Sequence, residues 1–219
     1  MERQKNRRIL ISGFVCVALF VLWTLMVKFI DVKPIGPNES KVGFATLNRF
    51  VHEVTGVHMA LYNITDWLSI IPICFIFGFA VIGLVQLIKR KSVKQVDSDI
   101  LILGGFYIVV MAVFVFFEYC VVNYRPVLIN GVLEASYPSS TTLLVMCVMP
   151  TAMIMISRRT KNQLLKSVVL FLLFLFTIFM VAGRLVSGVH WMSDIVGGAV
   201  LSAGLVMIFY SLIEMCSDK

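Results

Sequence analysis

The sequence predicts an all-α integral membrane protein: a bundle of six transmembrane helices with a short amphipathic interfacial helix in its first outer loop. Hydrophobic residues make up 59% of the 219 residues and charged residues only 14%. The mean hydropathy of +0.95 is too apolar for a soluble domain of this size. The apolar runs are long and unbroken, which favours helices over a β-barrel. Because no repeat or linker divides the chain, we expect residues 1–219 to form a single membrane domain.

Six segments are long enough to cross a hydrocarbon core about 30 Å thick, which takes about 20 residues per helix. In chain order they are Ile9–Ile30, Trp67–Ile88, Ile100–Val122, Ser139–Ile156, Ser167–Ser187 and Asp194–Met215. The first follows a basic stretch and resembles a signal peptide. It is too long for one, however, and no small-residue cleavage site follows it. We therefore expect it to be a retained span.

The basic residues predict the orientation of these spans. Four Lys or Arg residues precede the first span, four lie in residues 89–94 and four in residues 158–166, whereas the alternate connections hold fewer. By the positive-inside rule both termini are cytoplasmic, and Arg125, Ser139 and His190 lie near the outer face of the plasma membrane. The basic residues that give the net charge of +7 thus lie in short clusters that orient the spans, rather than in a binding patch. We therefore expect no nucleic-acid partner.

The first outer connection contains the predicted interfacial helix. Between Lys41 and His58, apolar residues recur at three- and four-residue spacing, namely Phe44, Leu47, Val51 and Val54. This spacing is typical of an amphipathic helix lying in the membrane interface. Such a helix could serve as a lid or substrate guide, or it could simply pack over the bundle.

Ionisable residues stand together between the last two spans. Arg184, His190 and Asp194 lie beside very apolar segments, where such groups are costly and are therefore functional candidates. If a helix runs from His190 to Asp194, the two side chains share a face, and the carboxylate can hold the second nitrogen of the imidazole. That arrangement prepares a histidine as a nucleophile or base. The alternative is a loop marked by interfacial polar residues.

Two further motifs are predicted near the same face. Pro126 is expected to end the third span and to leave Arg125 at the outer surface, where a lone arginine can also be an interfacial anchor. Hydroxyl residues then open the fourth span, namely Ser139, Ser140, Thr141 and Thr142. A helix N-terminus with hydroxyl side chains suits phosphate, although ordinary N-capping produces the same pattern.

Together these motifs resemble the type 2 phosphatidic acid phosphatase family. The family signature reads Lys-x6-Arg-Pro, then Pro-Ser-Gly-His, then Ser-Arg-x5-His-x3-Asp. Arg125 and Pro126 match the end of the first motif, and Pro138 and Ser139 match the start of the second. The third motif is matched, with both spacings intact, by Arg184, His190 and Asp194. The resemblance implies six spans with the three motifs gathered at one face.

The resemblance also implies a role for each matched residue. His190 would attack phosphorus and form a phosphohistidine, and Asp194 would orient it. The phosphoryl oxygens would be held by Arg125, Arg184 and the segment Ser139, Ser140 and Thr141. Preorganised cations and backbone donors stabilise the charge that spreads over these oxygens in the transition state.

The chain departs from the signature at three positions. Glu118 stands at the lysine position; it could pair with Arg125, seven residues later on the same helix face, and would then modulate the site by weakening phosphate binding or by setting the position of that arginine. Thr141 stands where the family places the histidine that protonates the leaving oxygen, and Gly183 replaces the serine before Arg184. Losing a positioned general acid typically costs ~10²–10⁴ in rate.

These observations favour a lipid phosphatase acting on a phosphorylated lipid at the outer leaflet. A diphosphate lipid such as polyprenyl diphosphate is the preferred substrate, because its leaving phosphate needs no proton. The alternative is a non-catalytic binder, sensor or carrier of lipid phosphates. A phosphotransferase that uses an acceptor alcohol ranks third. We expect no metal or cofactor, since no carboxylate or histidine cluster has ligand spacing. The sequence does not predict the oligomeric state.

Overall fold

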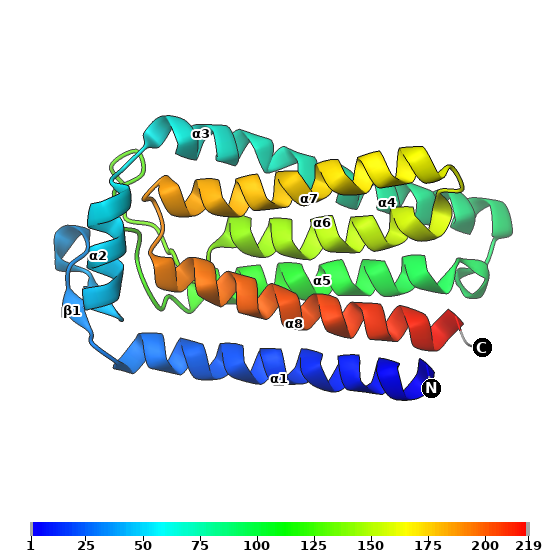
Figure 1. Ribbon diagram of the computed structural model, residues 1–219, viewed down its shortest axis with the longest axis horizontal. Helices are drawn as coiled ribbons and strands as arrows, with labels where there is room; N and C mark the ends of the chain where they lie inside the picture. Colours follow the sequence, from blue (N-terminus) through cyan, green and yellow to red (C-terminus); the bar gives the residue numbers. More distant parts are fainter. Residues whose placement is uncertain (1, 218–219) are drawn as a thin grey trace.

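The computed structural model describes residues 2–217 and confirms a bundle of six helices long and apolar enough to cross a membrane. The long helices run side by side (Figure 1), and short elements cap one end. In chain order the helices are α1 (Glu2–Phe29), α2 (Ala45–Thr55), α3 (Met59–Leu68), α4 (Ile70–Arg90), α5 (Ser98–Tyr119), α6 (Ser140–Arg159), α7 (Gln163–Val186) and α8 (Met192–Ser217). The short elements at that end include β1 (Lys33–Pro34), β2 (Lys41–Val42) and the 3₁₀ turn η1 (Pro37–Glu39), whereas the 3₁₀ turn η2 (Val93–Gln95) lies in the α4–α5 connection at the other end.

The predicted spans agree with these helices except at some ends. The second span was expected to begin at Trp67, but α3 and α4 form one nearly continuous span, Met59–Arg90. Only Ser69 separates them, and its backbone stays close to helical. The third span was expected to reach Val122, but α5 ends at Tyr119. Cys120 leaves the helical conformation there, so the residues that follow belong to a loop.

Helix α6 forms the centre of the bundle. Buried residues make up 56% of its most apolar stretch, compared with 11% for α1 and for α7. Its buried side chains include Leu143, Val145, Met149 and Met155. The surrounding helices expose most of their apolar surface, as expected for faces in contact with lipid. The start of α6 is therefore fixed in position by helices on several sides.

Helices α1 and α8 pack closely along their length, so the first and last helices are neighbours (Figure 1). The approach depends on glycine, because a side chain at Gly204 would meet the carbonyl oxygen of Gly13 at 2.9 Å. Both described chain ends consequently lie at one end of the bundle, together with the α4–α5 and α6–α7 connections (Figure 1). Ion pairs tie this end together: Arg90 with Asp97, Arg159 with Asp99, and Arg158 with Glu214.

The opposite end carries the other connections and α2, which lies across it (Figure 1). Asn48 on the inner side of α2 is buried, donates to Ser193 Oγ over 2.9 Å, and accepts from the Ser193 amide over 3.1 Å. On the other side, Leu47, Phe50 and Val54 are exposed. Helix α2 is thus amphipathic with its apolar side outward, and its location at a membrane interface stays a prediction.

Candidate active site

The loop between α7 and α8 positions His190. A turn follows Val186, and Gly188 adopts a φ of +66°, which favours glycine. A Cβ at Gly188 would also lie 1.9 Å from the carbonyl oxygen of Gly56. Both the positive φ and this close approach therefore require glycine at position 188. His190 precedes α8 by two residues. The expectation that one helix carries both His190 and Asp194 is therefore wrong, because the glycine turn delays the helix start.

The imidazole of His190 is 3% exposed and contacts two residues of the connection between α5 and α6. Its Nδ1 lies 3.0 Å from Ser136 Oγ and 3.2 Å from the Ser136 carbonyl oxygen. Its Nε2 lies 3.4 Å from Nη1 of Arg125. Because Arg125 can only donate, Nε2 is the nitrogen that carries the lone pair and Nδ1 carries the proton. This is the tautomer that a nucleophilic Nε2 requires.

Asp194 lies in the first turn of α8 and is completely buried. Its carboxylate accepts hydrogen bonds from Ser136 Oγ (2.5 Å), Asn123 Nδ2 (3.0 Å), the Trp191 amide (3.1 Å) and Ser193 Oγ (3.2 Å). Within residues 2–217 no direct hydrogen bond joins it to His190, contrary to expectation. Ser136 lies between them, so the geometry forms a chain from Nδ1–H to Ser136 Oγ and on to Asp194.

The surroundings of His190 keep its imidazole neutral. Burial lowers the pKa of His190 well below the usual value of 6.5, and the charges of Arg125 and Arg184 lower it further. The hydrogen bond to the Ser136 backbone acts in the opposite direction. A neutral imidazole retains the lone pair needed to attack phosphorus.

Arg125 reaches the site from a loop rather than from a helix end. Since α5 ends at Tyr119, Pro126 does not stop it, and the expected shared face with Glu118 does not exist. The Arg125 amide instead donates to the carbonyl oxygen of Glu134 over 3.1 Å. The guanidinium Nε lies 3.1 Å from Glu134 Oε2 as an ion pair, although its N–H is not aligned for a hydrogen bond. The predicted partner Glu118 is thus replaced by Glu134.

Arg184 is 2% exposed in the last turn of α7. Its Nη2 donates to Asp66 Oδ1 over 2.8 Å and to Thr141 Oγ1 over 2.5 Å. Its guanidinium carbon lies 4.8 Å from the centre of the Tyr62 ring. The other two nitrogens, Nε and Nη1, are buried without a hydrogen-bond partner in the described part of the chain. Buried donors without partners are costly, so they are suited to an anion that enters the site.

The hydroxyl residues at the start of α6 have different surroundings. Ser139 is the N-cap: its Oγ accepts from the Thr142 amide over 3.5 Å and from Thr142 Oγ1 over 3.1 Å. Its own amide donates to the Asp194 carbonyl oxygen over 3.1 Å, which joins α6 to α8. Ordinary capping therefore occupies the Ser139 hydroxyl. Ser140 is partly exposed, and Thr141 is held by Arg184.

Several residues of this site were missed in the sequence. Their polar side chains meet the candidate residues through the fold: Asn123, Ser136, Glu134, Asp66 and Tyr62. Asp66 carried a detectable signal, because a carboxylate at the edge of an apolar span is unusual. Ser136 carried none, since a serine in a loop is common.

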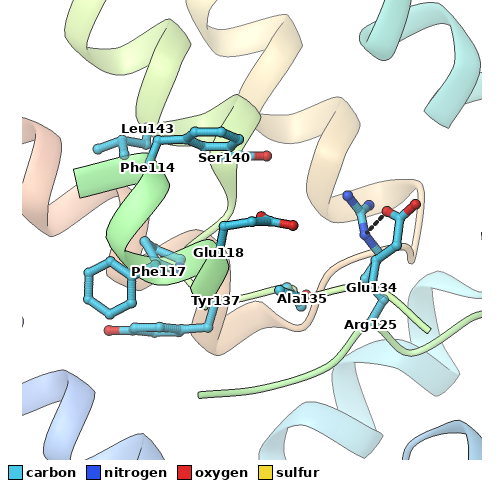
Figure 2. Close-up of a pocket in the computed structure, with 11 residues that line it drawn as sticks. Phe114, Phe117, Glu118, Arg125, Glu134, Ala135, Tyr137, Ser140 and Leu143 are labelled. Atoms are coloured by element: carbon cyan, nitrogen blue, oxygen red, sulfur yellow. Dashed lines mark ion pairs between the residues drawn. The ribbon is translucent and has the colours of Figure 1, made fainter. Parts of the chain in front are cut away.

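Two cavities adjoin the site. The first, of about 260 Å³, is lined by Arg125, Ser136, Glu118 and Glu134 together with aromatic side chains (Figure 2). The second, of about 500 Å³, is largely apolar and runs between α4, α5 and α6 to Thr141 and Asp66. Phe114, Ser140 and Leu143 line both cavities. A polar and an apolar compartment thus meet at the start of α6.

No three His, Cys, Asp or Glu side chains among residues 2–217 cluster as metal ligands would. Positive charge near His190 comes instead from the two arginines.

The sequence model of the PAP2 superfamily matches residues 10–218. The fold is similar to the crystal structure of a transmembrane PAP2 type phosphatidylglycerolphosphate phosphatase from Bacillus subtilis. The TM-score is 0.58 at 16% identity, over 94% of this chain and 96% of the other. A search of the curated proteins found no match.

Proposed function

The chain belongs to the PAP2 superfamily and is a multi-pass membrane phosphatase of that family, and from this premise we propose that it hydrolyses a phosphorylated lipid at the outer leaflet. The reaction proceeds through a phosphohistidine at His190. The observation that carries the proposal is the contact of a buried, neutral imidazole with Arg125, beside the unpartnered donors of Arg184.

In this mechanism each group has a defined task. Nε2 of His190 attacks phosphorus, forming the N–P bond as the bond to the leaving oxygen breaks. The free N–H groups of Arg184, Arg125 and the N-terminus of α6 bind the phosphoryl oxygens. Ser136 and Asp194 stabilise the proton on Nδ1 as the ring becomes positive. Water then cleaves the N–P bond, which releases phosphate and restores the imidazole.

The leaving group supports a diphosphate lipid as the preferred substrate. Thr141 occupies the position of the family's general acid, and its oxygen already accepts a hydrogen bond from Arg184. A threonine hydroxyl cannot supply a proton to a lipid alkoxide near neutral pH. When the outer phosphorus of a diphosphate is attacked, a lipid monophosphate leaves, and this anion needs no proton. A polyprenyl diphosphate has this chemistry.

The charge pattern supports an extracytoplasmic site in the plasma membrane. The three basic clusters belong to the end of the bundle opposite His190 (Figure 1). By the positive-inside rule that end is cytoplasmic, so His190 faces the outside.

A second candidate function rests on the ion pairs of the two arginines. Arg125 is paired with Glu134 and Arg184 with Asp66, so each cation is partly neutralised before a ligand binds. Partly neutralised arginines stabilise the transition-state charge less, and Thr141 cannot act as a general acid. Both features suit a protein that binds or carries lipid phosphates without hydrolysing them.

A phosphate-release assay on purified protein tests the proposal. The substrates are a lipid monophosphate and a diphosphate with the same chain. We expect faster release from the diphosphate, and no release by His190→Ala. We expect Thr141→His to raise monophosphate turnover by at least ~10²-fold, because it restores a general acid. Thr141→Gln, which is similar in size but has no suitable pKa, is the matched control and should give no gain.

Two results would decide against this function. Faster turnover of the monophosphate by the natural chain would reject the leaving-group explanation. Tight lipid-phosphate binding without release of phosphate from either substrate would favour the carrier.

A further inference from the structure

The phosphate site has little net positive charge of its own. Arg184 forms its ion pair with Asp66 at 2.8 Å, and Arg125 lies 3.1 Å from Glu134. A third carboxylate, that of Glu118, lines the same cavity as Arg125. A lipid phosphate entering this site therefore meets three carboxylates and two guanidinium groups, and a cation that accompanies the phosphate would offset the excess negative charge.

Glu118 has no partner of its own. Of the described residues, none donates a hydrogen bond to its carboxylate or forms an ion pair with it. It also lies in the last turn of α5, which contains no basic residue, so it faces the negative end of the helix dipole. Figure 2 shows its carboxylate pointing into the cavity, towards the pair formed by Arg125 and Glu134. Its side chain is exposed, so a cation that enters the cavity can reach the carboxylate.

Aromatic side chains line part of this cavity. Phe114, Phe117 and Tyr137 lie beside Glu118, on the side away from Arg125 (Figure 2). Aromatic rings attract organic cations, and a carboxylate beside aromatic walls suits an ammonium group better than a metal ion, which requires several oxygen ligands.

Arg125 provides a positive charge in the same cavity. It is 9% exposed, and its Nε, although 3.1 Å from Glu134 Oε2, makes no aligned hydrogen bond. Its Nη1 contacts His190 at 3.4 Å. The cavity thus offers a buried donor to a phosphate at one side and a free carboxylate at the other.

We propose that this cavity binds a cationic headgroup: an ammonium group carried by the phosphorylated lipid, with Glu118 as its counter-ion and Phe114, Phe117 and Tyr137 as its walls. The inference rests on the proposed function for the position of the phosphate. It concerns the group beside the phosphate, whereas the preference for a diphosphate concerns the bond that breaks. The two preferences are therefore measured separately.

The test compares two long-chain alkyl monophosphates that differ only in an amino or a hydroxyl group on the carbon next to the phosphate-bearing carbon. For the natural chain, in the presence of a metal chelator, we expect kcat/KM to be roughly tenfold higher for the amine. Glu118→Gln should abolish this ratio, and Glu118→Lys should invert it. Glu53→Gln, an exposed glutamate on α2, is the matched control and should leave the ratio unchanged.

Equilibrium binding of the same two lipids to the His190→Ala protein separates this proposal from the proposed function. If no phosphate is released but the amine still binds more tightly in a Glu118-dependent manner, hydrolysis is rejected and the cationic headgroup stands. Equal binding and equal kcat/KM of the two lipids would overturn the headgroup proposal. A preference for the amine that survives in Glu118→Gln would overturn the assignment of its counter-ion.

Discussion

Ser136 is the residue that most changes the expected chemistry. Its hydroxyl lies 3.0 Å from His190 Nδ1 and 2.5 Å from Asp194 Oδ2, so it transmits the effect of the carboxylate to the imidazole. A direct pair between histidine and aspartate would orient the ring with one contact. The longer chain requires the serine hydroxyl to donate to Asp194 and to accept from His190 at the same time.

We predict that Ser136→Ala lowers kcat by roughly 10²-fold with little change in KM, because a misaligned nucleophile loses rate rather than binding. Steady-state kinetics on a diphosphate lipid provides the measurement. Ser136→Thr keeps the hydroxyl and should recover most of the rate. The control is Ser202→Ala, which removes the hydroxyl of a buried serine on α8 that does not contact His190. An unchanged kcat in Ser136→Ala would show that Asp194 acts without this bridge.

At this scale the sequence predicted the charged residues of the matched motifs and missed their partners, both the neutral ones and the carboxylates of Asp66 and Glu134. Arg184, His190 and Asp194 stood out because ionisable groups are rare beside apolar segments. Ser136 and Asn123 did not, because neutral polar residues are ordinary in loops. The pairing of Arg125 with Glu118 was predicted wrongly. It assumed that the third helix continues to Arg125, whereas α5 ends at Tyr119, six residues earlier.

Among the elements, the spans were predictable and the ends were not. Long apolar runs determine where a helix crosses a membrane, whatever the helix contacts. The ends depend on tertiary contacts. The helix before α4 extends back to Met59, and α8 begins only after the turn at Gly188. The site residues lie at or near these helix ends. Because tertiary contacts determine the ends, the geometry of the site could not be predicted from the composition of the spans.

The α7–α8 loop provides a prediction of its own. Gly188→Ala should lower kcat/KM by more than ~10²-fold, because the loop must move away from Gly56 and take His190 with it. Gly131→Ala is the matched control: Gly131 also has a positive φ, of +80°, but its missing side chain would meet nothing within 4 Å. Phosphate release and thermal unfolding measure both variants. Equal losses in the two would show that backbone strain alone, and not the position of His190, determines the effect.

In the whole molecule, the bundle brings distant segments to one end. Arg125, His190 and Asp66 come from three different connections or helix ends, and they meet around the start of α6. The positive-inside pattern predicted that Arg125, Ser139 and His190 lie at one face, but it did not predict that Asp66 joins them. It could not predict that each arginine has a carboxylate partner, since those partners come from other parts of the chain.

The central claim is that this end of the bundle forms a phosphohistidine at His190 with the help of both arginines. The most direct measurement is a rapid quench of the purified protein with a lipid diphosphate labelled at its outer phosphorus. The account predicts an acid-labile, base-stable label on His190 that is absent from His190→Ala. In Arg184→Ala, the label should form about 10²-fold more slowly. Release of phosphate without any label on His190 at any quench time would contradict the account.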